Sequence, residues 1–387
     1  MKKLIIAMLA LLPMGALAQG GQLNGSGYYR VQNVTTKRYF SIVDNKNTSV
    51  GYGGAGVTDL AAFKMLEGST AADFTDVIAC NPATICYVDK VGSQYNIKGQ
   101  GLDLHQQTGY YLNVSQNANG SYRLYGSSSG VAVYLIDYTL AGWTHPSTGG
   151  GDKISWYLLP VDQSATQYFG VKPDFETPAT GRHWGTMYAG FAFQPSSTNT
   201  KVYVVDRVVG GYAVVREATG VIAENTPVLV SCQSASPADN KLTLQPYQNT
   251  AAGSTPLKGN FYCNFPDDGT AEKHTNLTAY NPSTMRMLSV TSDGYPAFVK
   301  SSASCVTFSG RSGSYLPANK CYLSVSASAP DVLRIVTEEE FTAGIDDLTT
   351  DVAPDADAPC FDLQGRRVAQ PAHGVYIRGG RKVVIRE

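Results

Sequence analysis

Two carboxylates in the middle of the chain have a spacing that glycoside hydrolysis could use. Asp174 and Glu176 lie two residues apart in a Pro-Asp-Phe-Glu segment. Side chains alternate along an extended strand, so both carboxylates would point to one face, close to the roughly 5 Å separation of a retaining glycosidase. Any Asp-x-Glu on a strand produces the same geometry, which leaves a solvated strand face as the alternative. Glu217 and Glu224 are weaker candidates for the same chemistry.

A second pattern of catalytic type, Gly-x-Ser-x-Gly, occurs at residues 126–130. In α/β-hydrolases this pattern exposes a nucleophilic serine between a strand and a helix. Here it joins two β-prone runs, 122–125 and 131–136, and this context predicts a hairpin loop instead. No Cys-x-x-Cys pair occurs and no histidine stands at ligand spacing from a cysteine, so we expect neither a zinc site nor another cofactor.

Seven cysteines are present, an odd number that leaves one thiol over in an oxidising compartment. Cys360 lies near the end of the chain, and the other six are predicted to form three disulfides. Cys80 and Cys86 would close a local loop. The remaining four, Cys232, Cys263, Cys305 and Cys321, allow three pairings that the sequence does not distinguish. Buried thiols are the alternative interpretation.

Tyrosine is frequent, with 24 copies among 387 residues. Its ring offers a rigid contact surface with a hydrogen-bonding tip, which enriches tyrosine at recognition surfaces. We therefore predict that binding involves the clustered aromatic residues Tyr28, Tyr29, Tyr110, Tyr111, Trp143, His183 and Trp184. Strand propensity is the alternative, because tyrosine also favours half-buried pleated surfaces. On that reading at least half of these residues belong to the core or to cross-strand pairs.

The elements that must position these residues are predicted to be β-strands. Runs with two-residue alternation, rich in Tyr, Val and Ile, recur between Gly, Asn, Ser and Pro. They cover residues 28–33, 39–43, 110–114, 122–125 and 131–136. Helical periodicity is confined to 59–66 and 338–341, the latter with Thr337 as N-cap. Short strands spaced by about ten residues predict an all-β fold, a sandwich or a barrel.

A short motif, an aromatic residue or Leu, then Ser or Asn, then Ile or Val, is repeated along the chain. Its copies lie at 40–42, 112–114, 288–290 and 323–325. Residues 27–33 with 38–42 resemble the opening strand pair of a ricin-type β-trefoil, and the Trp-Tyr-Leu-Leu-Pro run at 156–160 resembles the strand that closes one. The resemblance implies a β-trefoil-like domain over residues 19–162. The chain lacks the Gln-x-Trp sugar-binding signature of that family, so lectin activity is not implied.

The second half, residues 163–343, is predicted to form a second β-domain, a sandwich or a barrel. Residues 315–323 echo residues 222–230, as though one strand-entry turn were used twice. Residues 182–336 resemble a β-domain common in exported proteins of Bacteroidetes, a similarity that carries no assigned chemistry. The acidic segment 344–359, rich in Pro and Ala, is predicted to be a flexible linker.

The end of the chain, residues 360–387, contains two β-prone runs, 361–368 and 374–385, around Pro371. The second run is predicted to turn at Gly379-Gly380 as a β-hairpin. Order and spacing resemble the C-terminal sorting signal of the type IX secretion system, matched at Asp362, Leu363, Gln364, Gly365, Arg366, Gly374, Tyr376, Gly380 and Lys382. Two positions depart from that pattern: Cys360-Phe361 stands where Val-Tyr is usual, and Glu387 follows the basic end. The resemblance implies export by the type IX machinery.

The beginning of the chain predicts export as well. Met1-Lys2-Lys3 precedes a short apolar run, 4–12, and the Ala-Leu-Ala at 16–18 fits a signal-peptide cleavage site. The run is shorter than the ~18–20 residues that span a bilayer, so we expect no transmembrane anchor in the mature chain. Only 16% of residues are charged and the net charge is −1, which provides no electrostatic surface for nucleic acid.

These patterns predict a secreted or cell-surface protein of two β-domains that acts by recognition rather than catalysis. The expected partner, besides the secretion machinery, is a host or environmental macromolecule, either a protein or a glycan. A secreted hydrolase of glycans or peptides with a carboxylate pair is the first alternative. A structural component of a surface coat is the second.

Overall fold

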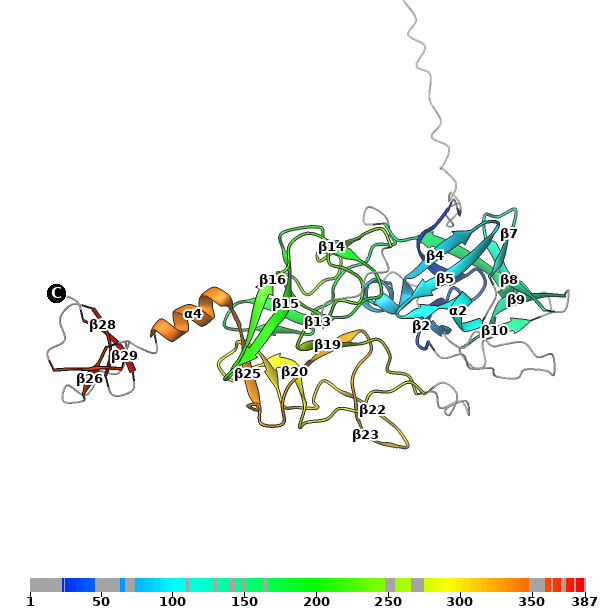
Figure 1. Cartoon of the computed structure of the whole chain (residues 1–387). Helices are drawn as coiled ribbons and strands as arrows, with labels where there is room; N and C mark the ends of the chain where they lie inside the picture. Colours follow the sequence, from blue (N-terminus) through cyan, green and yellow to red (C-terminus); the bar gives the residue numbers. More distant parts are fainter. Residues whose placement is uncertain are drawn as a thin grey trace, which may run out of the picture.

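The computed structural model describes residues 23, 25–45, 63–66, 74–108, 111–128, 131–138, 143–147, 151–162, 166–247, 255–265, 275–347, 359–362, 365–369, 374–378 and 381–385. Within these residues the chain is almost entirely β, as expected, with two large curled sheets and three small ones (Figure 1). The signal segment 1–18 and the site residues Tyr110, Leu363, Gln364 and Gly380 lie outside them. No helix in the described part is long and apolar enough to cross a membrane.

The first sheet has eleven strands, all paired antiparallel. They are β1 (Gly27–Asn33), β2 (Tyr39–Ile42), β3 (Phe63–Leu66), β4 (Cys86–Val91), β5 (Gln94–Gly99), β6 (Leu102–Asp103), β7 (Asn113–Gln116), β8 (Tyr122–Ser128), β9 (Val131–Tyr138), β10 (Trp143–Ser147) and β11 (Ser155–Pro160). The first and last strands pair with each other, from Tyr29 opposite Pro160 to Asn33 opposite Trp156, so the sheet curls back on itself.

Two expectations for this half are resolved by the strand pairing. Residues 126–128 of the Gly-x-Ser-x-Gly segment end β8 and pair with 131–133 of β9, with Gly126 opposite Val133, so the predicted hairpin is confirmed. The helix predicted over 59–66 is wrong for its described part, because residues 63–66 form β3. That strand pairs in register with β2, and this pairing overrides the weak helical periodicity.

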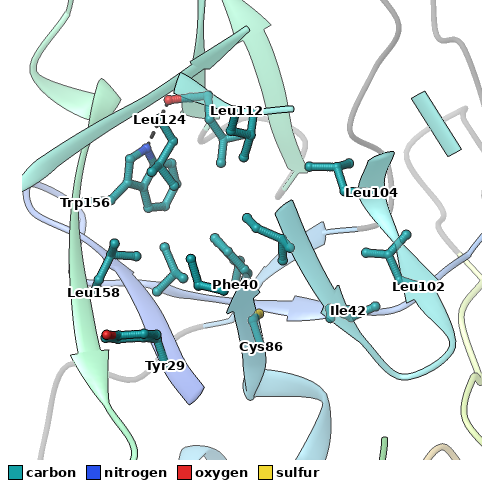
Figure 2. Close-up of a cluster of buried hydrophobic side chains, with 14 of the residues drawn as sticks. Tyr29, Phe40, Ile42, Cys86, Leu102, Leu104, Leu112, Leu124, Trp156 and Leu158 are labelled. Carbon is teal, nitrogen blue, oxygen red and sulfur yellow. Dashed lines mark hydrogen bonds between the residues drawn. The ribbon is translucent and has the colours of Figure 1, made fainter. Parts of the chain in front are cut away.

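Alternate residues of these strands fill one core (Figure 2). Trp156 is fully buried at its centre, and its ring contacts Phe40 edge-on with the ring centroids 5.9 Å apart. The indole Nε1 donates a hydrogen bond of 3.0 Å to the backbone carbonyl of Leu135. The largest side chain of this core is therefore buried without leaving its polar atom unpaired.

A buried ion pair ties the loop before β2 to β9. Asp137 is fully buried and accepts hydrogen bonds from Arg38, through Nε at 3.1 Å and through Nη2, and from the hydroxyl of Thr36. Its side chain has no exposed surface, and that of Arg38 is only 9% exposed. Removing one charge would leave the other enclosed and uncompensated.

The second large sheet has ten strands. They are β12 (Phe175–Thr177), β13 (Arg182–Met187), β15 (Thr200–Val209), β16 (Tyr212–Glu217), β17 (Val228–Cys232), β19 (Leu257–Asn260), β20 (Met285–Val290), β21 (Pro296–Val299), β24 (Lys320–Ser324) and β25 (Val332–Thr337). Two short ladders flank it, β14 (Phe193–Pro195) with β18 (Leu242–Leu244) and β22 (Val306–Phe308) with β23 (Arg311–Tyr315). All of its pairings are antiparallel except that of β16 with β25.

This sheet contains the same four-strand unit twice. The strand order β13-β17-β15-β16 is repeated as β19-β24-β20-β21, and β25 joins the two units by pairing with β16 and β21. The strand-entry turns also match, because Asn225 and Asn319 both have a φ of 58°. Asparagine tolerates this left-handed conformation better than most residues. The sequence echo between 222–230 and 315–323 is thus a repeat of backbone structure.

Helices are short and few in the described chain. They are η1 (Phe74–Ile78), η2 (Pro82–Thr84), α2 (Leu104–Thr108), η3 (Asp152–Ile154) and α4 (Glu338–Asp347). Thr337 caps α4 as predicted, since its hydroxyl accepts from Glu340 N at 3.2 Å and its own N–H donates to Glu340 Oε2 at 2.7 Å. The helix runs past residue 343 into the segment predicted to be a linker.

The C-terminal residues form a small four-stranded sheet (red in Figure 1). Its strands are β26 (Cys360–Phe361), β27 (Arg367–Val368), β28 (Gly374–Arg378) and β29 (Arg381–Ile385). The predicted hairpin is present as β28 and β29, with Tyr376 opposite Val383 and Ile377 opposite Lys382. The turn before β27 is closed by Asp362, which accepts from Arg366 Nε at 2.6 Å, and by Gly365, whose φ of 78° suits glycine.

We expect Asp137→Asn to lower the free energy of unfolding by about 3–5 kcal/mol, because it leaves the Arg38 guanidinium buried beside a neutral group. Urea unfolding followed by circular dichroism measures this change. Asp152→Asn, an exposed position in the same half, is the matched control and should change stability by less than about 0.5 kcal/mol. Equal stability of the two variants would show that the pair does not hold β2 against β9.

Candidate binding site at the junction of the two sheets

The two large sheets meet along a seam of hydrogen bonds. Gly190 N donates to Gln100 Oε1 at 3.1 Å, and the Tyr262 hydroxyl donates to the Gln100 carbonyl. Arg30, fully buried in the first sheet, donates from Nη1 to the Gln167 carbonyl at 2.9 Å. Contacts between residues so far apart in sequence fix how the two halves sit against each other.

Gln100 occupies the centre of this seam. It is only 1% exposed, and its φ of 52° lies in the left-handed region that few residues other than glycine adopt. Its neighbours Gly99 and Gly101 also have positive φ values, 151° and 75°. The three residues form a tight turn between β5 and β6 that brings the backbone of the first sheet against Gly190.

A pocket of about 310 Å³ opens beside this turn. Most of its lining side chains are polar: Lys98, Asp103 and Gln106 come from the first sheet and α2, and Glu224, Asn225 and Tyr247 come from the second half. Because both halves contribute, the pocket exists only when the seam is formed. Sequence patterns within either half therefore could not identify it.

Hydrogen bonds fix the charged groups on the first-sheet side of the pocket. Asp103 Oδ1 accepts from Asn96 Nδ2 at 2.8 Å and from Gln106 N at 3.1 Å, so it caps the start of α2. Lys98 Nζ donates to Asp89 Oδ2 at 2.8 Å. Burial alone would lower the pKa of Lys98, but the hydrogen bond to Asp89 raises it overall, so the ammonium stays charged at neutral pH.

A cluster of tyrosine rings packs beside these polar groups, and one of them, Tyr247, lines the pocket. Tyr87 and Tyr247 stack with ring centroids 4.6 Å apart, and Tyr28 contacts Tyr87 edge-on at 5.2 Å. Burial, followed by the nearby Glu224 carboxylate, raises the pKa of the Tyr28 hydroxyl, which therefore remains a hydrogen-bond donor. Glu224 is itself only 2% exposed.

Several buried polar atoms around this pocket make no hydrogen bond with any described residue. Among them are Asn225 Oδ1, Gln100 Nε2 and the Tyr28 hydroxyl. Asn225 lines the pocket, Gln100 lies between the lining residues Gly99 and Gly101, and Tyr28 lies beside Glu224. Each unpaired buried polar group destabilises the fold by about 1–3 kcal/mol. A polar ligand that formed hydrogen bonds with these atoms would remove that cost, which would favour its binding.

The aromatic residues predicted to bind do not form one site. Tyr29 is 6% exposed in the first core and Trp184 is 8% exposed against Tyr203, as the strand-propensity alternative predicts. Tyr111 stacks on His105 with centroids 3.8 Å apart, and His183 is half-buried in β13. Among the predicted aromatic residues whose side chains the structure describes, Tyr28 alone lies at the junction. The backbone of Trp143 belongs to β10, and its side chain lies outside the described part.

The predicted carboxylate pair lies on β12 and just before it. Asp174 and Glu176 are both exposed, flanking the more buried Phe175, as strand alternation requires. Asp174 Oδ1 accepts from Lys320 Nζ at 2.6 Å, and Glu176 stands opposite His183 in the ladder. Asp174 also borders a separate cavity of about 370 Å³ in the second half. The charged partner of the Asp174 carboxylate is thus the Lys320 ammonium.

The predicted disulfides are not formed, because each of the seven cysteines, all of them described, is present as a thiol. Cys86, Cys232 and Cys321 lie in three different core clusters, which separates them from one another. Burial raises the pKa of Cys232 to about 11 and that of Cys321 to about 12. The remaining predicted partners, Cys80, Cys263 and Cys305, are half-buried. Counting cysteines does not reveal that a thiol is serving as a small core residue.

No group of three or more His, Cys, Asp or Glu side chains converges on one point in the described part of the chain. Comparison with known proteins adds no further assignment: no protein-family model matches the chain, and a search of curated protein sequences finds no match.

We expect Gly190→Ala to open the seam. A Cβ at this position would lie 2.8 Å from the Gln100 Cα, so the two backbones must separate, at a cost of about 1–3 kcal/mol in unfolding free energy. Hydrogen exchange should also accelerate at the amides of 99–103 and 188–190. Gly211→Ala, where nothing lies within 4 Å of the added carbon, is the control. Unchanged exchange in Gly190→Ala would contradict the close contact.

Proposed function

We propose that the chain is an exported binding protein that recognises a glycan in the junction pocket without cleaving it. The observation that carries this proposal is the lining of the pocket, where carboxylate, amide and ammonium groups from both halves occur together with Tyr247. Sugar hydroxyls both donate and accept hydrogen bonds, and the C–H faces of sugars pack on aromatic rings. A pocket of this composition suits a polyhydroxylated ligand better than an apolar one.

The N-terminal half is then a β-trefoil-like domain over residues 19–162 that has lost the sugar site of the ricin type, and residues 163–343 supply the other wall of the pocket. Support comes from the pairing of β1 with β11, which brings the predicted opening and closing strands together. Phe40 and Ile42 of the repeated motif are fully buried in that core.

The tail at 360–387 directs export through the type IX machinery, after the signal segment has taken the chain across the inner membrane. The pairing of β28 with β29 and the turn closed by Asp362, Gly365 and Arg366 support this role. They give the matched residues a structural task, the formation of a compact β-unit that a receptor can bind.

A glycan hydrolase is the second candidate, because the carboxylates of Asp103 and Glu224 line the same pocket from opposite halves. A glycosidase needs one carboxyl group to deliver a proton. Asp103 instead uses Oδ1 to accept two hydrogen bonds that hold α2 in place. This structural task favours binding over turnover.

The proposal is tested by adding the purified full chain to an array of polysaccharides and measuring both captured glycan and released reducing ends. We expect capture without release. Glu224→Gln should weaken binding by about 10- to 100-fold, since a hydrogen bond to a charged group contributes about 1.5–3 kcal/mol. Tyr247→Ala should weaken it through loss of the ring. Glu339→Gln, exposed on α4, is the matched control and should bind like the parent chain.

Other outcomes assign the function differently. Release of reducing ends that is lost in both Asp103→Asn and Glu224→Gln would establish the hydrolase. Capture of a protein but of no glycan would overturn the ligand class. Glycan capture that survives both Glu224→Gln and Tyr247→Ala would move the site away from the junction.

Deleting residues 360–387 tests the export route. In a bacterium that carries a type IX secretion system, the shortened chain should accumulate in the periplasm while the full chain reaches the cell surface or the medium. Cell fractionation followed by immunoblotting distinguishes the two locations. Surface delivery of the shortened chain would rule out the tail as the sorting signal.

A further inference from the structure

A second cavity, of about 350 Å³, lies in the second half of the chain, near the start of α4. Its lining includes the polar and aromatic side chains of Arg182, Trp184, Lys201, Tyr203, Tyr295 and Glu340. None of the residues that line the junction pocket borders it. The two cavities are therefore separate sites, and each can bind a ligand independently of the other.

Trp184 borders this cavity, and the polar atom of its side chain is unpaired. The side chain is 8% exposed and stacks on Tyr203 with ring centroids 5.6 Å apart. Its indole Nε1 is buried and makes no hydrogen bond with any described residue. Trp156 in the other half is also buried, but its Nε1 donates to a carbonyl. Because buried donors are normally paired, the unpaired donor of Trp184 indicates an acceptor supplied from outside.

Arg182 adds a second donor with unused capacity. Its Nε donates to Ser231 Oγ at 2.6 Å, and its Nη2 donates to the carbonyls of Ser231 at 2.7 Å and Asn199 at 3.2 Å. These acceptors are all neutral, and Arg182 forms no ion pair within the described part of the chain. The guanidinium is thus held in place by neutral acceptors alone, and its Nη1 is left without a protein acceptor.

Of the two cationic side chains that line the cavity, only Arg182 forms no ion pair in the described part of the chain. Lys201 contributes a second positive charge, although it pairs with Glu217 at 2.9 Å on the exposed side. Glu340 is the one acidic side chain of the lining, and its Oε2 accepts from Thr337 N in the cap of α4. Burial raises the pKa of the Tyr203 hydroxyl, which therefore stays protonated and can donate as well.

We propose that this cavity binds a carboxylate group, with Arg182 Nη1 and Trp184 Nε1 donating to its two oxygens. The apolar side chains of Val215, Pro296 and Ile335 border the same cavity and would contact the body of the ligand. A guanidinium suits this task because its N–H groups match the geometry of a carboxylate. The experiment distinguishes two sources of such a group, an acidic sugar of the uronic type and the C-terminal residue of a peptide.

The indole N–H signals of the full chain provide the test. The chain has three tryptophans, so Trp184→Phe identifies the signal of Trp184 in a proton–nitrogen correlation spectrum. Two acids are titrated, glucuronate and N-acetyl-phenylalanine, each beside its neutral counterpart, glucose and the N-acetyl-phenylalanine amide. We expect a saturable shift of the Trp184 signal with at least one acid and at least tenfold weaker binding of its neutral counterpart. The acid that binds identifies the source of the carboxylate.

Substitutions separate binding from folding. Arg182→Gln should weaken binding of the acid at least tenfold. Arg182→Lys keeps the charge but loses the paired donors, so its affinity should lie between those of the parent chain and Arg182→Gln. Trp184→Phe keeps the ring stack, so it should retain the parent melting temperature while losing affinity for the acid, which isothermal titration calorimetry measures because this variant lacks the Trp184 signal. Arg216→Gln, which removes an exposed arginine from the same sheet, is the control and should bind normally. Equal binding of acids and neutral counterparts, or no saturable shift with either acid, would overturn the proposal.

Discussion

The close approach of Gly190 to Gln100 is the constraint on which the arrangement of the two halves depends. No side chain fits between them, and the Gly190 N–H is used to hold the Gln100 side chain. The left-handed turn at Gln100 points the β5–β6 connection toward the second half, and the junction pocket opens beside that turn. The site is therefore a product of the packing of two sheets, and each sheet alone supplies only part of its lining.

Much of the fold was predictable because strand alternation is a local property. Alternate residues of β1, β8 and β11 enter the first core, as the two-residue period of the sequence predicts, and the repeated turn at Asn225 and Asn319 was visible as an echo. The Thr337 cap of α4 was equally local. Errors arose where a distant partner decided the outcome. β3 is a strand because β2 pairs with it, and Cys232 and Cys321 do not pair because they lie in separate cores.

The candidate site was much less predictable than the fold. Its charged groups are Lys98 and Asp103 from one half and Glu224 from the other, and no spacing rule connects positions so far apart in sequence. The sequence indicates Glu224 only as a weaker carboxylate candidate, and Tyr28 only as one of seven aromatic candidates for binding. The unpaired polar atoms around them are a consequence of burial, and burial is known only once the chain is folded.

The place where β25 lies in the second sheet has a mechanical consequence. This strand leads directly into α4, and it is hydrogen-bonded on both sides, to β16 and to β21. A pull applied through the C-terminal tail would load the middle of the sheet in shear, where many hydrogen bonds must break together. Had the tail followed an edge strand such as β12, the same pull would have peeled the sheet open one bond at a time. The second sheet should therefore resist unfolding by a force applied at its C-terminal strand.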